Sequence, residues 1–336
     1  MSKLATSLAF ATLSVLPFTN VSRAYAAETL PGAGRSVTPT IQAGDPQQTF
    51  QTYLVDMGMQ DLGYKVEEPV IAQMQAAMVA VANGDATYFA GYWDPLHNSF
   101  IPNLGADKVS IVGSIVANSI QGYLVDKKTA DAHGIKTIEQ FKDPNIAKLF
   151  ETEGDGKATL YGCDPGWGCE RVIEHQLDAY GLRNTVTHKQ GSYSAIIGDA
   201  IERVKAGKPT LYYTWTPLWL SSVLVPGKDV VWLTVDKTEL PAEQANAKTN
   251  VPGIGNLGFS VNNQRILVNT AFLKNNPAAK KWFEEIAIPV EDVNAENLAM
   301  HNGEDKDSDI KMHADAWKAA HQAQWDAWIE AAKAAK

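Results

Sequence analysis

Three tryptophans stand at positions where their side chains could bind a small ligand. Trp93 and Trp215 open the similar segments Trp-Asp-Pro-Leu and Trp-Thr-Pro-Leu, each after a strand-like run, and Trp167 lies between the two cysteines. Indole faces attract cations, and quaternary ammonium groups suit such cages because they form no N–H hydrogen bonds and lose little on desolvation. The three rings therefore predict a cage for a small cation.

Hydrogen-bond donors for an anionic group occur beside two of these tryptophans. Cation contacts with three rings would contribute about 1.5–6 kcal/mol, whereas micromolar affinity needs about 8 kcal/mol, so further contacts are required. The N–H groups of Gly168 and Cys169 lie at the expected start of a helix, where anions bind. His97 follows Trp93 by four residues, which places both on one side of a helical turn. Together these groups predict a small zwitterion such as glycine betaine, although the cysteine loop could be a surface staple and His97 a buried side chain without a ligand.

The chain has two cysteines, Cys163 and Cys169, which could form a disulfide or remain thiols. An oxidising compartment favours the disulfide, a redox enzyme more typically carries C-x-x-C, and a zinc site needs about four ligands. Segment 151–157 is similar to a calcium-binding loop, but Gly162 stands where the twelfth position requires Glu, so we expect a turn. No metal site and no cofactor are predicted.

Residues 1–26 are typical of a secretory signal peptide, with an apolar stretch from Leu8 to Phe18 and Ala24-Tyr25-Ala26 as the cleavage site. The stretch is about half of the roughly 20 residues that a spanning helix needs, so we expect a secreted, periplasmic protein. The formal charge of −9 over 336 residues, without a basic cluster, argues against nucleic acid or anionic lipid as partners. No later segment predicts insertion into a membrane.

Alternating helices and strands must position the tryptophans, and their order predicts an α/β fold. Two similar series are expected, each ending in a tryptophan: helices over 46–62 and 71–82 with a strand over 87–92, and a helix over 193–206 with a strand over 210–213. The repetition predicts two similar lobes that face each other, with the ligand at the carboxyl ends of strands. Asp94 and Thr216, each followed by proline, are expected to cap new helices.

Other segments extend this pattern. Strands are expected over 109–116, 121–125 and 230–235, and helices over 142–150 and 169–180. The segment 309–335 places three tryptophans and His321 on one stripe of a single helix, which predicts a cover for the core of one lobe.

Five ordered runs carry a resemblance to a known family: Leu-Pro-Gly at 30–32, Gly-Tyr-Leu-Val-Asp-Lys-Lys-Thr-Ala-Asp at 122–131, Gly-Cys-Asp-Pro-Gly-Trp-Gly-Cys-Glu at 162–170, Tyr-Tyr-Thr-Trp-Thr-Pro at 212–217 and Pro-Gly-Lys-Asp-Val-Val-Trp-Leu at 226–233. In these runs the chain resembles the substrate-binding proteins of ProU-type glycine betaine/proline betaine ABC importers of Gram-negative bacteria. The resemblance covers essentially the whole chain after residue 26.

The resemblance implies a type II periplasmic binding protein fold, in which two α/β lobes are joined by a two-segment hinge with the ligand cleft between them. Lobe one would comprise residues 27–120 and 258–336 and lobe two residues 121–257, with crossings near 118–124 and 252–262. It also implies an aromatic box formed by Trp93, Trp167 and Trp215. The implied carboxylate donors are His97 and the backbone of Gly168 and Cys169. The implied disulfide joins Cys163 and Cys169.

The implied function is that of a monomeric solute-binding component that captures glycine betaine or proline betaine and, after hinge closure, signals a membrane permease. Choline, carnitine or a sugar remain alternative ligands, since tryptophan faces also stack on pyranose rings. An enzyme is not expected, because the chain lacks G-x-S-x-G, H-E-x-x-H, a P-loop and a Rossmann glycine-rich turn. Asp94, beside the first tryptophan, could favour the cation or act as a helix cap.

Overall fold

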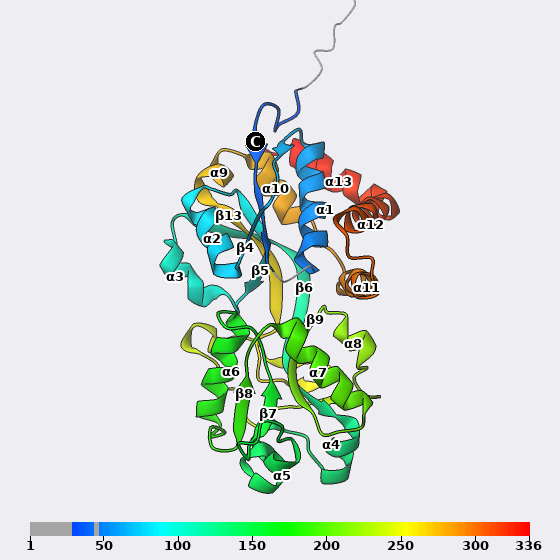
Figure 1. Ribbon diagram of the computed structural model, residues 1–336. Coiled ribbons are helices and arrows are strands. Elements are labelled where there is room, and N and C mark those ends of the chain that lie inside the picture. The colour runs from blue at the N-terminus through cyan, green and yellow to red at the C-terminus, as the bar shows by residue number, and fades with distance from the viewer. Residues whose placement is uncertain (1–28, 44–46) are drawn as a thin grey trace, which may run out of the picture.

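A computed structural model describes residues 29–43 and 47–336 of the chain, and it has two lobes, one above the other in Figure 1. The predicted signal peptide over residues 1–26 and residue 46, the expected start of the first helix, lie outside the described residues. Strands and helices alternate through both lobes, which confirms the predicted α/β class. Among the described residues, no helix is both long and apolar enough to span a bilayer.

One mixed sheet runs through both lobes. Its strands are, in spatial order, β4 (Val70–Ala72), β2 (Pro39–Gln42), β5 (Tyr88–Asp94), β13 (Asn262–Asn269), β6 (Val109–Asp126), β9 (Leu211–Thr216), β7 (Ala158–Tyr161) and β8 (Val186–Lys189), and β10 (Val230–Trp232) also pairs with β6. Two small pairs lie apart from it: β1 (Ser36–Val37) with β3 (Lys65–Val66), and β11 (Asn250–Val251) with β12 (Gly255–Asn256).

The long strand β6 connects the lobes (Figure 1). Its residues 109–119 pair with β13 of the upper lobe, and residues 120–125 pair with β9 of the lower lobe. The sequence predicted two strands, over 109–116 and 121–125, and that was wrong: each half has its own hydrogen-bonding partner, so the strand continues for 18 residues. Asn118, with a φ of 59°, marks the irregular point beside the crossing.

The upper lobe is built around β5, β13 and the first half of β6 (Figure 1). Its helices are α1 (Gln47–Asp61), α2 (Met74–Asn83), η1 (Asn98–Phe100), α3 (Ile101–Leu104), α9 (Thr270–Lys274), α10 (Pro277–Glu285), α11 (Val290–His301), α12 (Asp307–Ala320) and α13 (Gln322–Lys333). Helix α1 buries Phe50, Leu54 and Met59 at helical spacing. Gly58 allows α1 to pack closely, because a Cβ there would lie 2.1 Å from the ring of Trp282.

The lower lobe packs its helices around β7, β9 and the second half of β6. Its helices are α4 (Lys127–His133), η2 (Ile138–Lys142), α5 (Pro144–Leu149), α6 (Gly168–Ala179), α7 (Tyr193–Lys205), α8 (Leu220–Val223) and η3 (Ala242–Gln244). Its apolar core also takes in Trp93 and Leu96 from the end of β5, so the two lobes are in contact through buried side chains.

Two helix predictions need correction. The helix expected over 71–82 begins at Met74, because Ile71 belongs to β4, where it pairs with Ile41. The single helix expected over 309–335 is two helices, α12 and α13, which meet at His321, whose imidazole hydrogen-bonds to the carbonyl of Trp317. The C-terminal tryptophans are nevertheless buried in the core of the upper lobe, as their spacing predicted.

Candidate functional site

A cavity of about 370 Å³ lies where the lobes meet, and all six predicted site residues line it. The upper lobe supplies Trp93 and His97, and the lower lobe supplies Trp167, Gly168, Cys169 and Trp215. Its wall has the aromatic character that small-molecule pockets favour. The six residues, which come from separate segments of the sequence, therefore meet at one place in the fold.

Each tryptophan is held by a different kind of element. Trp93 lies in β5 opposite Gln264, Trp215 lies in β9 opposite Gln121, and Trp167 is the residue directly before helix α6. The ring of Trp167 meets that of Trp215 edge to face, with centroids 5.8 Å apart. The two strand tryptophans are buried, whereas Trp167 is partly exposed. Two rings are thus fixed by sheet register and the third by the loop before α6.

His97 is a buried, neutral histidine in the wall of the cavity. The backbone N–H of Trp93 donates to its Nδ1 at 3.1 Å, and its side chain is buried. Burial lowers the pKa of His97 to about 3, so the ring is neutral at physiological pH. Because Nδ1 accepts a hydrogen bond, the proton of the neutral ring resides on Nε2. That N–H can donate to a ligand carboxylate.

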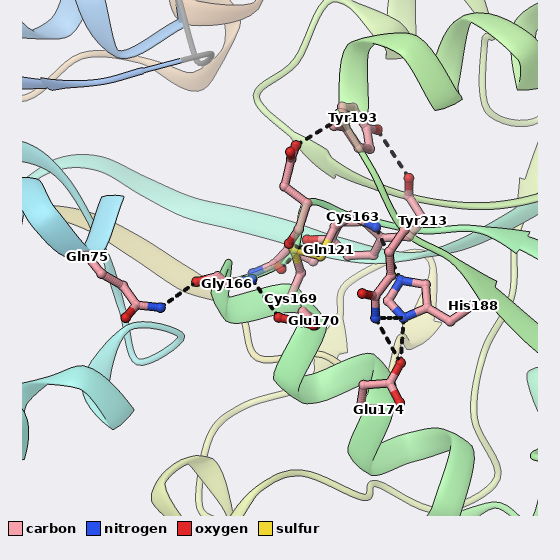
Figure 2. Close-up of a disulfide and its surroundings, with 12 residues drawn as sticks. Gln75, Gln121, Cys163, Gly166, Cys169, Glu170, Glu174, His188, Tyr193 and Tyr213 are labelled. Carbon is pink, nitrogen blue, oxygen red and sulfur yellow. Dashed lines mark hydrogen bonds and ion pairs between the residues drawn. A yellow bond between two sulfur atoms is a disulfide. The ribbon is translucent and has the colours of Figure 1, made fainter. Parts of the chain in front are cut away.

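The loop before α6 is shaped by the bridge between Cys163 and Cys169, whose Cα atoms are 6.5 Å apart (Figure 2). Within the loop, Gly166 N–H donates to Glu170 at 2.6 Å, and Asp164 accepts from the N–H of Tyr193 at 2.9 Å. Helix α6 therefore begins in a fixed place, and N–H groups in its first turn have no helical carbonyl partner. Such a terminus attracts an anion.

Gly168 permits a close approach between the lobes at this point. A Cβ at Gly168 would lie 2.7 Å from the Cγ of Leu96, which belongs to the upper lobe. Nearby, Gln75 donates to the carbonyl of Gly166 at 3.0 Å across the same junction. Trp215 reaches the upper lobe through its Nε1, which donates to Gln47 at 3.3 Å. The lobes are thus in direct contact beside the cavity.

Comparison with known proteins identifies the family of the chain. Residues 36–320 match the family described as the substrate binding domain of ABC-type glycine betaine transport systems. The chain belongs to this family. Members are the substrate-binding parts of transport systems, which confirms the expectation of a binding protein rather than an enzyme.

Individual relatives extend over nearly the whole chain. It is 49% identical over 312 residues to the glycine betaine-binding periplasmic protein OusX of Dickeya dadantii, covering 93% of this chain and 94% of that protein. It is 48% identical over 329 residues to the glycine betaine/proline betaine-binding periplasmic protein of Escherichia coli, covering 98% and 97%. The crystal structure of lactococcal OpuAC, closed around glycine betaine, superposes with a TM-score of 0.66 at 21% identity, covering 88% and 99%. That structural similarity confirms the expected two-lobe binding-protein fold.

Six further residues line the cavity of this family member and were not predicted: Gln42, Gln48, Met74, Leu96, Gln121 and Tyr213. Two of the glutamines touch each other, because Gln48 Nε2 donates to Gln42 Oε1 at 3.3 Å. Tyr213 could have been predicted from the alternation of side chains along a strand, because it is two residues before Trp215 and shares its face of β9. The glutamines gave no comparable signal.

The expectation that Asp94 and Thr216 cap helices was wrong. The next helical turns, η1 and α8, begin several residues later, with His97 and Trp219 in the capping positions. Asp94 instead forms an ion pair with Arg265, with 2.8 Å between Oδ2 and Nη1. Arg265 also donates to two carbonyls of β6. Asp94 therefore neutralises an arginine of the upper lobe, and it does not line the cavity.

Proposed function

We propose that this protein captures glycine betaine or proline betaine between its lobes and delivers it to the membrane permease of an ABC importer. The observation that carries the proposal is the wall of the cavity, where three indole rings and several uncharged donors face one space. A ligand with both a quaternary ammonium group and a carboxylate has a partner for each half there. The relatives named above, which bind such betaines, support the same assignment.

In this proposal, the three tryptophans surround the ammonium group, and His97 with the first N–H groups of α6 binds the carboxylate. The rings would contribute about 1.5–6 kcal/mol, and charge-assisted hydrogen bonds of about 1.5–3 kcal/mol each would supply the rest of a micromolar affinity. Because the rings and donors come from both lobes, the ligand completes its contacts only when the lobes are closed.

The lobes of the proposal are residues 27–120 with 258–336, and residues 121–257. Support comes from the change of partner within β6, which leaves β13 after Ser119 and pairs with β9 from Ile120. The chain returns to the upper lobe ahead of β13, which begins at Asn262. We infer a monomer in the periplasm, exported by the signal peptide over residues 1–26 and recognised by the permease in its closed form.

Choline, carnitine and sugars are the alternative ligands. Sugar sites commonly use Asp, Asn or Arg side chains to bond ring hydroxyls, and among the described residues no side chain of these types lines the cavity. Choline and carnitine carry the same trimethylammonium group as glycine betaine, so the cage alone would accept them. The polar end of the cavity must therefore decide among these cations.

A fluorescence titration of the mature, oxidised protein tests the proposal, because the three cage tryptophans report directly on the cavity. We expect a saturable change at micromolar glycine betaine and proline betaine, a weaker response to choline and free proline, and none to maltose. A response to maltose or free proline with none to either betaine would overturn the proposed ligand.

A further inference from the structure

Gln121 is a buried side chain in the wall of the cavity with a hydrogen-bonding group left over. It lies in β6 just beyond the crossing between the lobes and is 1% exposed. Its Oε1 accepts a hydrogen bond from the hydroxyl of Tyr213 at 2.5 Å. Its Nε2 has no acceptor anywhere in the part of the chain that the structure describes. A buried amide N–H group without an acceptor is unfavourable unless a ligand supplies one.

The register of the sheet places this amide beside the cage. Gln121 pairs directly with Trp215 across β6 and β9, and residues opposite each other in an antiparallel pair point to the same face. Tyr213, two residues before Trp215, lies on that face too, so its hydroxyl can reach the amide diagonally. Figure 2 draws Gln121 and Tyr213 among the surroundings of the disulfide. Both residues line the cavity together with Gly168 and Cys169, the first residues of α6.

The hydrogen bond from Tyr213 decides which end of the Gln121 amide is left without a partner. Burial raises the pKa of Tyr213 well above its usual range, so the phenol keeps its proton. In the described residues Gln121 Oε1 is the acceptor for that O–H group. Turning the amide over would leave the tyrosine proton without a partner. The oxygen of the amide is therefore fixed toward Tyr213, and the NH₂ group is the part left without a partner.

We propose that Gln121 is a specificity-determining residue whose Nε2 donates a hydrogen bond to the carboxylate of the bound zwitterion. The inference rests on the proposed function and adds a fourth donor to the carboxylate end of that site. Methyl groups of a quaternary ammonium cannot accept a hydrogen bond, so this donor contributes nothing to the cation. A carboxylate gains a charge-assisted bond from it, whereas the hydroxyl of choline is a weaker acceptor. Gln121 thus favours betaines over choline.

Titration calorimetry with glycine betaine and choline on the oxidised protein and on Gln121→Met tests this role. Methionine has a similar volume and no donor, so we expect glycine betaine affinity to fall about tenfold and choline affinity to change less than about twofold. In Gln121→Glu the new carboxylate would repel the carboxylate of glycine betaine, so the ratio of choline affinity to glycine betaine affinity should rise further than in Gln121→Met. Circular dichroism and thermal melts establish that each variant is folded.

Gln244→Met is the matched control. Gln244 is a buried glutamine of the lower lobe that accepts a hydrogen bond from Ser260 and does not line the cavity. Its loss should leave the ratio of the two affinities unchanged. Equal weakening of both ligands in Gln121→Met, or no weakening of either, would show a packing role and overturn the inference. A wild-type protein that binds neither ligand would overturn the proposed function itself, which the first titration reveals before any variant is made.

Discussion

The indole of Trp219 lies flat on the imidazole of His301, with ring centroids 3.7 Å apart and 5° between the planes. Trp219 follows β9 in the lower lobe, whereas His301 ends helix α11 in the upper lobe. Helix α11 makes a second contact with the lower lobe, because the N–H of Leu218 donates a hydrogen bond to Asn294 Oδ1 at 2.9 Å. The lobes are therefore joined at a second place, outside the cavity, by residues that do not line it.

Removing this stack should speed ligand release. An aromatic pair at a partly exposed site is worth about 0.5–1 kcal/mol, so His301→Ala should raise the dissociation rate and the Kd about two- to fivefold without touching the ligand. Stopped-flow fluorescence with a displacing ligand measures the rate. His133→Ala, which removes an exposed histidine of α4, is the control. An unchanged release rate in His301→Ala would mean that the stack does not stabilise the closed form.

The same histidine should make binding sensitive to acid. Partial burial and the charge of Lys205 on α7 lower the pKa of His301 where the lobes are in contact, and with the lobes apart the pKa should return toward about 6.5. Protonation therefore favours the open form, so affinity should be constant above about pH 7 and decline by a few-fold at most as pH falls below 6.5. His301→Phe keeps the stack and cannot titrate. Titrations from pH 5 to 8 should show a flatter profile in that variant, and matching profiles would disprove the assignment.

Trp167 is the cage residue best suited to a test by truncation, because it is partly exposed and lies in a loop outside the core. Trp167→Ala should weaken betaine binding more than about tenfold, the equivalent of one good cation–π contact, with the fold intact. Trp167→Phe keeps an aromatic face, so its betaine affinity should lie between those of the wild type and of Trp167→Ala. Wild-type affinity in a folded Trp167→Ala variant would refute the cage.

The local parts of the site were predictable from sequence because short-range patterns decide them. Helix α7 spans Tyr193–Lys205, one residue shorter than the predicted range, since its apolar periodicity and the glycine stop after it lie within one stretch of chain. The strand-end tryptophans followed from the same local pattern. The indole rings and the N-terminus of α6 could therefore be predicted from the sequence.

The parts that could not be predicted depend on contacts between distant segments. Gln121 and Tyr213 meet only because β6 pairs with β9 in one register, 92 residues apart along the chain. Asp94 was open to two roles, a helix cap or a partner for the cation, until the structure paired it with Arg265, which is 171 residues away. Strand pairing and ion pairs at such separations leave no periodic trace in the sequence, so neither contact could be predicted.

The disulfide should matter more to binding than to stability. It closes a short loop, with a sequence separation of 6, so its removal should cost only about 2 kcal/mol of unfolding free energy. The bridge also sets the start of α6 and the position of Trp167, and we expect its loss to weaken betaine binding more than about 30-fold. Titrations and urea unfolding of the protein with both cysteines changed to alanine compare the two effects. A large loss of stability with unchanged affinity would contradict this prediction.

The stability of the upper lobe should depend on pH through Asp56, a buried carboxyl group of α1 that accepts a hydrogen bond from Tyr88. Burial raises its pKa from 3.8 to about 7, so the folded protein holds a proton that the unfolded chain releases. This contribution is fully present below about pH 4 and is lost as pH rises through 7, an effect of up to about 4 kcal/mol. Asp56→Asn keeps an acceptor for Tyr88 but does not titrate. Urea unfolding at pH 5 and pH 8 measures the unfolding free energy of both proteins. The unfolding free energy of the variant, relative to the wild type, should be higher at pH 8 than at pH 5. The same difference at both pH values would mean that Asp56 is ionised in the fold.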